Sequence, residues 1–281
     1  MPITWQQWLI KASTRLRAAA SPSAKRDAEI MLGQVTGVAR TRLLAFGETP
    51  LTAAQCLMLD ALLLRRERGE PVAYLIGEHE FWSLRLQVSS ATLIPRPDTE
   101  CLVQRALELL PPAHADVLDL GTGTGAIALA LASERPAWRI TGVDRLPEAV
   151  SLAQDNAASL GLNNTQFLEG DWFAPLQMHR YSLIVSNPPY LEAGDPHLAQ
   201  GDVRYEPRSA LVAGEDGMQS LSAISRQVGA HLMLGGWLLL EHGWQQGGAV
   251  RTLLTDAGFS HIATLLDYGQ HERVTQGQWL A

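Results

Sequence analysis

The first 70 or so residues carry apolar side chains at helical spacing. The spacing recurs in three stretches, at residues 5–16, 24–35 and 53–68. Thr52 is a typical N-cap for the third stretch. Because no strand-like alternation interrupts these stretches, the pattern predicts a small helical bundle over residues 1–73.

Residues 74–95 change to a period of two. Glu80-Phe-Trp and Leu84–Val88 each alternate apolar and polar positions, and Ser83 lies at the short turn between them. This pattern is typical of a β-hairpin. We expect the hairpin to link the helical bundle to a second domain over residues 96–281.

From about residue 116 onward, strand-like and helix-like segments alternate. The predicted strands are 117–120, 139–144, 165–168, 181–186, 236–241, 261–266 and 273–279, and the predicted helices are 125–134, 147–160, 217–234 and 247–257. Such alternation predicts an α/β fold with a doubly wound, mostly parallel sheet. The last two strands are separated only by a short turn, so the last strand must be antiparallel.

Net charge limits the classes of partner. Lys and Arg number 22 and Asp and Glu number 29, giving a net charge of −7 over 281 residues. Residues 1–75 carry 10 basic and 6 acidic residues, while residues 76–281 carry 12 and 23. An acidic second domain argues against binding to nucleic acid through phosphate contacts. A basic first domain leaves room for an acidic protein partner.

Cysteine and histidine patterns give no indication of a metal or a disulfide framework. Cys56 and Cys101 are too few for either, and the eight histidines lack metal-ligand spacing. The N-terminal residues contain no long apolar run, so we expect no signal peptide, no membrane association and a cytoplasmic location. We also expect a monomer.

A glycine-rich loop follows the first predicted strand of the second domain. Its residues are Asp119-Leu-Gly121-Thr122-Gly123-Thr124-Gly125. Glycines allow a ligand to approach the backbone closely, and the helix behind them begins with a partial positive charge. The G-x-G-x-G spacing differs from the G-x-G-x-x-G of dinucleotide folds, and no lysine follows as in a phosphate-binding loop.

Asp144 ends the second predicted strand, 21 residues after Gly123. An acidic residue at this place accepts hydrogen bonds from ribose hydroxyls. The glycine loop and Asp144 together indicate a cofactor that contains adenosine but no pyrophosphate. S-adenosylmethionine fits this description. NAD is the alternative, and the glycine spacing disfavours it.

The tetrapeptide Asn187-Pro188-Pro189-Tyr190 follows the fourth predicted strand, at the edge where ligands of such sheets bind. A planar, conjugated NH₂ group is a poor nucleophile. The Asn187 side-chain oxygen and a fixed backbone carbonyl can each accept one of its hydrogens and orient it. Pro188 and Pro189 supply no N–H, and Tyr190 can pack against the planar group.

These motifs resemble those of S-adenosylmethionine-dependent methyltransferases that modify planar nitrogens. The whole chain resembles more closely the bacterial peptide chain release factor N5-glutamine methyltransferase family (HemK/PrmC). The resemblance covers nearly the full length and includes the blocks at 69–75, 94–100, 187–190 and 205–211. It implies a Rossmann-like methyltransferase sheet, with release factors as the protein substrate.

The reaction that the resemblance implies is methylation of the glutamine amide in the Gly-Gly-Gln loop of release factors. It carries cofactor contacts over to Gly121–Gly125, Asp144, Trp172 and Asn187. Trp172, just past the third strand, would pack on adenine, with Asp171 near the adenine amino group. No motif residue is an obvious general base, so we expect catalysis by positioning.

Several alternatives remain at this point. An N6-adenine DNA or RNA methyltransferase shares the tetrapeptide but predicts a basic groove and base flipping. A non-catalytic cofactor-binding module predicts decay of the tetrapeptide. Arg96 and Glu100 either serve the site or pair with each other across a helical turn. The helical domain either contacts the substrate or is only structural.

Overall fold

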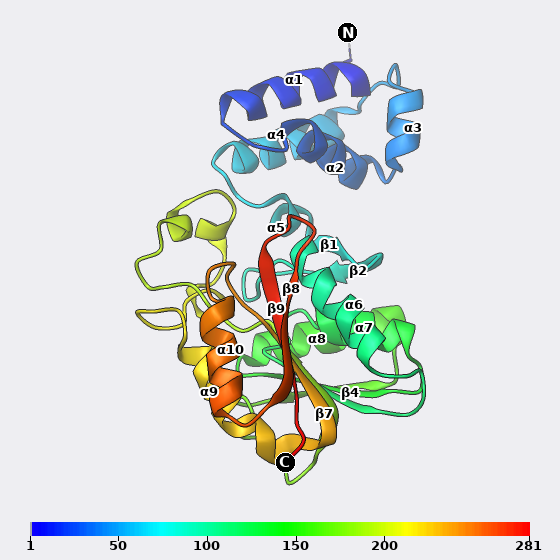
Figure 1. Ribbon diagram of the computed structural model, residues 1–281. Helices are drawn as coiled ribbons and strands as arrows, with labels where there is room; N and C mark the ends of the chain where they lie inside the picture. Colours follow the sequence, from blue (N-terminus) through cyan, green and yellow to red (C-terminus); the bar gives the residue numbers. More distant parts are fainter. Residues whose placement is uncertain (1) are drawn as a thin grey trace. The chain divides into compact units, whose positions relative to one another are not determined.

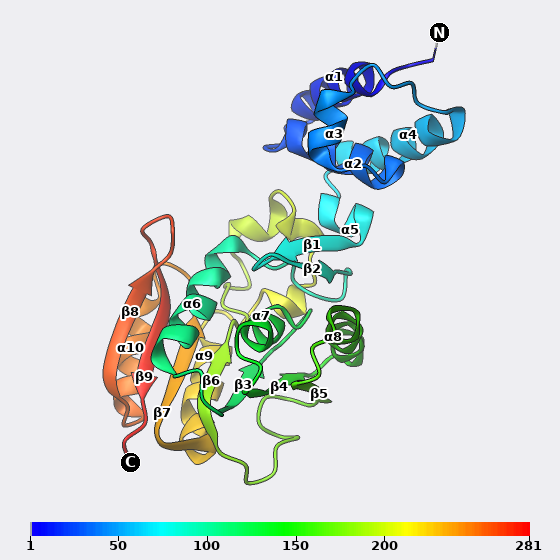
Figure 2. The ribbon, with the colours of Figure 1, turned by 90° about the vertical axis from the view of Figure 1, so that its right-hand side faces the viewer.

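The computed structural model describes residues 2–281 and divides the chain into two compact units (Figures 1 and 2). The first unit contains the residues up to Glu78 together with Pro196–Tyr205, and the second contains His79–Asp195 and Glu206–Ala281. Each unit has its own hydrophobic core. Within the described residues, no helix is both long and apolar enough to cross a membrane.

The first unit is the predicted helical bundle. Its helices are α1 (Trp5–Ala18), α2 (Ala24–Thr36), α3 (Arg40–Ala45), α4 (Ala53–Glu67) and α5 (Val72–Ile76). Thr4 and Thr52 each form a capping box with a glutamine three residues later, which explains where α1 and α4 begin. The short helices α3 and α5 were not predicted, because five or six residues give no clear periodicity.

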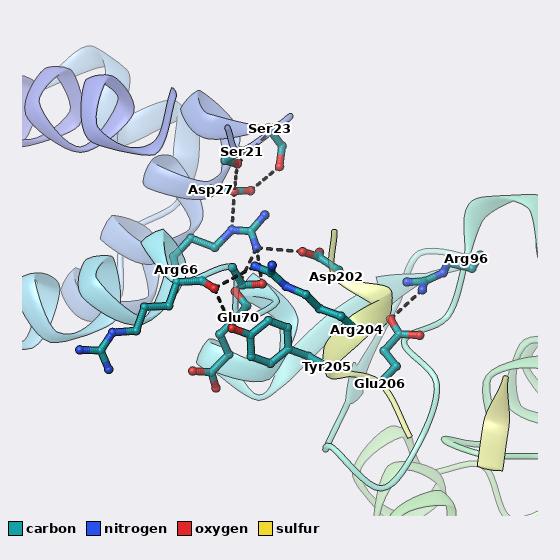
Figure 3. A network of polar contacts seen from close by, with 12 residues as sticks. Ser21, Ser23, Asp27, Arg66, Glu70, Arg96, Asp202, Arg204, Tyr205 and Glu206 are labelled. Carbon is teal, nitrogen blue, oxygen red and sulfur yellow. Dashed lines mark hydrogen bonds and ion pairs between the residues drawn. The ribbon is translucent and has the colours of Figure 1, made fainter. Parts of the chain in front are cut away.

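A segment from much later in the sequence completes this unit. It consists of two short 3₁₀ turns, η2 (Pro196–Ala199) and η3 (Val203–Tyr205). Arg66 Nη1 donates to Asp202 Oδ1 at 2.8 Å (Figure 3). The Tyr205 hydroxyl donates to the Arg68 carbonyl at 2.7 Å. The helical unit therefore holds a segment that begins six residues after the tetrapeptide.

The predicted hairpin is confirmed. It consists of β1 (Glu78–Phe81) and β2 (Leu84–Gln87). The two turn residues Trp82 and Ser83 have φ values of 51° and 60°, as a tight hairpin turn requires.

Seven strands of the described chain form the sheet of the second unit, in the order β5-β4-β3-β6-β7-β9-β8. Their bounds are β3 (Asp116–Leu120), β4 (Arg139–Asp144), β5 (Thr165–Glu169), β6 (Tyr181–Ser186), β7 (Leu232–Glu241), β8 (Ser260–Leu266) and β9 (Glu272–Gln278). Neighbours from β5 to β7 pair in parallel, and β9 pairs antiparallel with both β7 and β8. The doubly wound fold with an antiparallel last strand is confirmed.

Helices cover both faces of this sheet (Figure 2). The helical elements of the unit are η1 (Pro97–Thr99), α6 (Glu100–Leu109), α7 (Ala126–Glu134), α8 (Pro147–Leu160), η4 (Arg208–Ala210), α9 (Gln219–Gln227), η5 (Val228–His231) and α10 (Gly247–Asp256). One core lies between the sheet and α6, α7 and α8, and the other lies between the sheet, α9 and α10. Adjacent residues such as Leu238 and Leu239 enter opposite cores, so the central strands are apolar throughout.

The predicted helix over 217–234 is wrong at its C-terminal end. The helix α9 ends at Gln227, and β7 already begins at Leu232. The predicted strand begins only at 236, but both Gly235 and Gly236 lie inside β7. Gly235 has a φ of 82°, and the pairing with β6 shifts register at this point. The two glycines therefore form an irregularity within one long strand.

Candidate active site

The predicted site residues meet at the carboxyl edge of the parallel strands. The glycine loop follows β3, Asp144 ends β4, Trp172 lies beyond β5, and Asn187 follows β6. They surround a cavity of about 440 Å³. The predicted residues on its wall are Gly121, Thr122, Gly123, Thr124, Asp144, Asp171, Trp172, Asn187 and Pro189. The cavity is therefore at the expected place for a ligand in an open α/β sheet.

The glycines of the loop have positive φ values, a backbone conformation that residues with a side chain rarely adopt. Gly121, Gly123 and Gly125 have φ values of 70°, 55° and 82°. Gly125 does not line the cavity but is the N-cap of α7, where an added Cβ would lie 3.0 Å from Leu129. The three glycines thus shape the loop, while the first two also lie at the cavity.

Asp119, just before the loop, is fully buried. Its Oδ2 accepts a hydrogen bond from the Thr122 hydroxyl at 2.6 Å. Burial raises the pKa of Asp119 to about 7, against the opposing effect of the Thr122 hydrogen bond. Asp119 therefore stabilises the loop through Thr122 and does not line the cavity.

Asp144 holds the loop against the end of β4. Its Oδ2 accepts from the backbone N–H of Gly123 at 2.9 Å, and its Oδ1 accepts from the backbone N–H of Leu146 at 3.0 Å. Each carboxylate oxygen keeps further acceptor capacity, and the residue lines the cavity. Asp144 can therefore fix the loop and accept hydrogen bonds from ligand hydroxyls at the same time.

Trp172 stands against the glycine loop. Its backbone has a φ of 48°, and a Cβ at Gly121 would lie 3.6 Å from the indole ring. Its neighbour Asp171 is exposed and also lines the cavity. The ring and the loop thus form adjacent walls, as expected for a site that takes a flat aromatic group.

These residues fit S-adenosylmethionine. The carboxylate of Asp144 suits a ribose diol, the indole of Trp172 suits adenine, and the bare backbone at Gly121 and Gly123 leaves room for the methionine part. The tetrapeptide contributes Asn187 and Pro189 to the same wall. The cavity can therefore hold the cofactor beside a group that is recognised by Asn187.

The tetrapeptide is held by hydrogen bonds to side chains from other parts of the second unit. Asn187 Nδ2 donates to Thr99 Oγ1 at 3.2 Å, and the Tyr190 hydroxyl donates to Glu241 Oε1 at 3.5 Å. Gln246 Nε2 donates to the Tyr190 carbonyl at 3.0 Å. Pro188 is buried, and neither Pro188 nor Tyr190 lines the cavity. Burial raises the pKa of the Tyr190 hydroxyl, which stays protonated.

Of the two alternatives left open for Arg96 and Glu100, their pairing with each other is wrong. Arg96 Nη2 donates to Glu206 Oε1 at 2.6 Å (Figure 3), and Glu100 Oε1 accepts from the backbone N–H of Trp82 at 3.0 Å. Glu100 lies at the first position of α6, while Arg96 precedes η1 in extended backbone, so the two are not on one helix. The Arg96 contact joins the sequence blocks at 94–100 and 205–211.

Sequence reasoning missed Thr99 and Glu241. The Thr99 side chain makes no capping hydrogen bond to α6 and instead contacts Asn187. Glu241 ends β7 at the carboxyl edge of the sheet and is 1% exposed. A lone acidic residue at the end of an apolar strand, beside the ligand edge, was the available signal.

Comparison with known proteins agrees with this geometry. A family model of the PrmC N-terminal domain matches residues 7–77, and a model of the methyltransferase small domain matches residues 98–202. A solved methyltransferase from Pyrococcus furiosus has the same fold, with a TM-score of 0.54 over 79% of this chain and 98% of its own at 14% identity. Fold and site together define an S-adenosylmethionine-dependent methyltransferase.

Two curated relatives match almost end to end. Release factor glutamine methyltransferase from Yersinia pestis is 59% identical over 277 residues, which is 99% of each chain. The Escherichia coli (strain K12) protein of the same name is 58% identical over 275 residues, covering 98% of this chain and 99% of its own. The chain belongs to the release factor glutamine methyltransferase family.

Proposed function

We propose that this chain transfers a methyl group from S-adenosylmethionine to the side-chain amide nitrogen (N5) of the glutamine in the Gly-Gly-Gln loop of release factors. Its full-length relatives are named release factor glutamine methyltransferase. The observation that carries the proposal is the placement of Asn187 on the wall of the cavity beside the glycine loop. With the cofactor bound in this cavity, the Asn187 amide would lie next to the methyl donor.

The cofactor would be held by the loop from Gly121 to Thr124, by Asp144 and by Trp172, with Asp171 nearby. S-adenosylmethionine supplies an electrophilic methyl carbon, and its sulfur keeps the electron pair of the broken bond. Asp144 would accept from the ribose hydroxyls, and the indole ring of Trp172 would pack against adenine. These residues orient the donor; they take no part in bond making.

The tetrapeptide would orient the acceptor. Asn187 Oδ1 and the carbonyl of Pro188 each accept one hydrogen of the glutamine NH₂ group. Both contacts draw the nitrogen out of conjugation and point its lone pair at the methyl carbon, and such orientation can supply much of a rate enhancement. Pro189, on the cavity wall, and Tyr190, behind it, would shape the slot for the planar amide.

No general base is required. The amide nitrogen becomes acidic only when the new carbon–nitrogen bond forms, and the proton then leaves for water. His242, the histidine that follows Glu241, is fully buried and hydrogen-bonded to Thr275 at 2.8 Å, so it does not reach the cavity. Positioning by acceptors is therefore the main contribution of the protein.

We also propose that the helical unit contacts the release factor. Residues 1–75 carry a net charge of +4 by the count of 10 basic and 6 acidic residues, which suits an acidic protein surface. The enzyme would act as a monomer in the cytoplasm, without binding nucleic acid directly. Reversing the charge of the exposed Arg17 and Lys25 should raise KM for the release factor and leave cofactor affinity unchanged. An unchanged KM would assign the unit a structural role.

The activity is tested by labelled methyl transfer to two substrates in parallel. Purified release factor and adenine-containing DNA are each incubated with enzyme and labelled cofactor. The proposal expects label in the release factor and none in DNA. Label in DNA alone would instead establish an adenine methyltransferase, which shares the tetrapeptide chemistry.

A further inference from the structure

The carboxyl edge of the sheet in the second unit divides into two halves. The loops assigned to the cofactor follow β3, β4 and β5 on one side of the sheet, while β7, β9 and β8 form the other side (Figure 2). The tetrapeptide follows β6, between the two halves. Among the described residues, none beyond Gln227 lines the cofactor cavity. The loops at the end of β7 and between β8 and β9 therefore lie beside the tetrapeptide, outside the cofactor site.

These loops carry exposed aromatic rings. Trp244, in the turn after β7, is 57% exposed, and Tyr268, in the turn between β8 and β9, is 63% exposed. His271 belongs to the same turn as Tyr268 and is also exposed, and its ring centre is 5.8 Å from that of Trp244. The two turns therefore lie side by side. We call the surface formed by Trp244, Tyr268 and His271 the aromatic rim.

Gln246 joins the first of these turns to the tetrapeptide. Its backbone N–H donates to the Gly243 carbonyl at 2.8 Å, and its Oε1 accepts from the Gly243 N–H at 2.8 Å, so the turn that contains Trp244 is closed twice. Its Nε2 donates to the Tyr190 carbonyl at 3.0 Å. A Cβ added at Gly243 would lie 3.7 Å from the Tyr190 ring. The turn that carries Trp244 is therefore fixed by the same side chain that holds Tyr190.

A buried carboxylate holds the second turn. Asp267 Oδ1 accepts from the backbone N–H of His271 at 3.0 Å, and its Oδ2 accepts from Arg273 Nε at 3.0 Å. Arg273 Nη1 also donates to the His242 carbonyl at 3.3 Å, and its Nη2 lies 3.8 Å from Asp98 Oδ2. The turn between β8 and β9 is therefore tied both to the end of β7 and to η1.

Rings that are held in this way suit a polypeptide partner. Tyr and Trp side chains offer a large contact area and lose little conformational entropy on binding, and a surface that is fixed in advance loses less. Both residue types are enriched among those that carry the binding energy of interfaces. The acceptor of the proposed reaction lies inside a polypeptide, so the chain on either side of the glutamine needs a surface beside the tetrapeptide.

We propose that the aromatic rim is the docking surface for the segment of release factor that flanks the target glutamine. Trp244 and Tyr268 would pack against the main chain and small side chains of that segment, and would thereby hold the glutamine beside Asn187. This inference rests on the proposed function, because only a polypeptide acceptor needs such a surface. It concerns the second unit and is separate from the proposed contact of the helical unit.

Affinity for release factor tests the surface. Trp244→Ala and Tyr268→Ala remove the rings, while Trp244→Phe and Tyr268→Phe keep a flat ring. Leu234→Ala is the matched control, because this side chain is 76% exposed near the opposite end of β7. Calorimetric titration of the full-length enzyme with unmodified release factor, in the presence of S-adenosylhomocysteine, measures binding without turnover. Each alanine variant should bind about tenfold more weakly, while the phenylalanine variants and the control stay close to wild type.

Kinetics separate docking from a loss of structure. The alanine variants should raise KM for release factor by about tenfold, with kcat at saturation and cofactor affinity unchanged, because Asn187 and the cavity are untouched. A general structural defect would lower kcat or cofactor affinity as well. Alanine variants that bind release factor as tightly as the wild type would overturn the proposal.

Cross-linking identifies the occupant of the rim. A photoreactive benzophenone side chain at position 268 of the full-length enzyme should capture release factor, with its attachment sites in the segment that carries Gly-Gly-Gln. Attachment to a different part of release factor, or to a second copy of the enzyme, would contradict the assigned occupant. Mass spectrometry of the cross-linked peptides distinguishes these outcomes.

The role of the rim and the proposed function can fail separately. If the wild type methylates release factor and the alanine variants bind it equally well, the rim has no docking role and the function stands. If the wild type binds release factor through the rim but adds no methyl group, the function fails and the docking surface stands. A wild type that neither binds nor methylates release factor contradicts both.

Discussion

Arg66 and Asp27 form an ion pair buried inside the helical unit, with 2.8 Å between Nε of Arg66 and Oδ2 of Asp27 (Figure 3). The two side chains are 4% and 6% exposed. The same guanidinium contacts Asp202 Oδ1 at 2.8 Å, and Ser21 and Ser23 both donate to Asp27. One arginine thus joins α4 to α2 and to the segment that follows the tetrapeptide.

Loss of Asp27 should destabilise the helical unit strongly. Asp27→Ala leaves the Arg66 charge buried without its main partner, which should lower the free energy of unfolding by about 3–5 kcal/mol. Asp202 is 41% exposed, so Asp202→Ala should cost no more than about 1 kcal/mol. Urea unfolding followed by tryptophan fluorescence, to which Trp5 and Trp8 in the core of this unit contribute, measures both. Equal losses would contradict the buried role of the Arg66–Asp27 pair.

Asp144 should control cofactor affinity. An amide at this place cannot accept hydrogen bonds from both Gly123 and Leu146, because one end of it is a donor. We expect Asp144→Asn to weaken S-adenosylmethionine binding by about tenfold or more, which equals about 1.4 kcal/mol. Calorimetric titration measures the affinity, with Asp155→Asn on the exposed face of α8 as the control. Unchanged affinity in Asp144→Asn would remove its assigned role.

Asn187 should affect turnover rather than cofactor binding. Asn187→Ala removes the acceptor for the substrate NH₂ group, and loss of one such preorganised contact typically costs on the order of 10²–10³ in kcat. The affinity for cofactor should change only modestly, since Asp144 and the glycine loop remain. Steady-state kinetics on release factor beside a cofactor titration measure the two effects. An active Asn187→Ala enzyme is incompatible with the mechanism.

Glu241 should reduce stability at high pH. Its pKa is raised to about 7 in the folded chain from an ordinary value of 4.5. A carboxyl whose pKa is raised in the folded state contributes to the free energy of unfolding. This contribution is complete below about pH 4.5 and is lost as pH rises through about 7. Glu241→Gln should therefore gain stability over wild type as pH rises, by up to about 3 kcal/mol at pH 8.5. Asp119 titrates in the same range in both chains, so the difference isolates Glu241.

The strands of the second unit were the most predictable part of the fold. β4 and β6, at Arg139–Asp144 and Tyr181–Ser186, agree with the prediction to the residue. Buried parallel strands are short continuous apolar runs between turn residues, so their limits can be read from sequence. The start of β7 was missed because Gly235 and Gly236 act through pairing with β6, which is not visible in sequence.

The parts of the site that are recognisable from local sequence motifs were also predictable. The glycine loop and Asp144 lie on neighbouring strands at the same edge, as their spacing indicates. Contacts between residues far apart in the sequence were not predictable. Thr99 and Asn187 are 88 residues apart, and Arg96 and Glu206 are 110 apart. Only the fold brings such pairs together, so the sequence could offer a local pairing of Arg96 with Glu100 as one alternative but not the actual contact of Arg96 with Glu206.

The segment from Pro196 to Tyr205 had no sequence signal for its place in the helical unit. Its polar contacts include those of Asp202, which accepts from Arg66, and of Arg204 and Tyr205, which both donate to the Arg68 carbonyl. Deletion of the N-terminal helices would therefore also strip the support from this segment. Point substitutions on the surface of the helical unit are the sounder test of its role.

The most direct test is mass spectrometry of a release factor after incubation with this enzyme and S-adenosylmethionine. The proposed function predicts one added methyl group, located by fragmentation on the side chain of the glutamine in the Gly-Gly-Gln loop. The Asn187→Ala enzyme should leave the same peptide unmodified. A wild-type reaction that leaves this glutamine unmodified, or methylates another residue instead, would contradict the central claim.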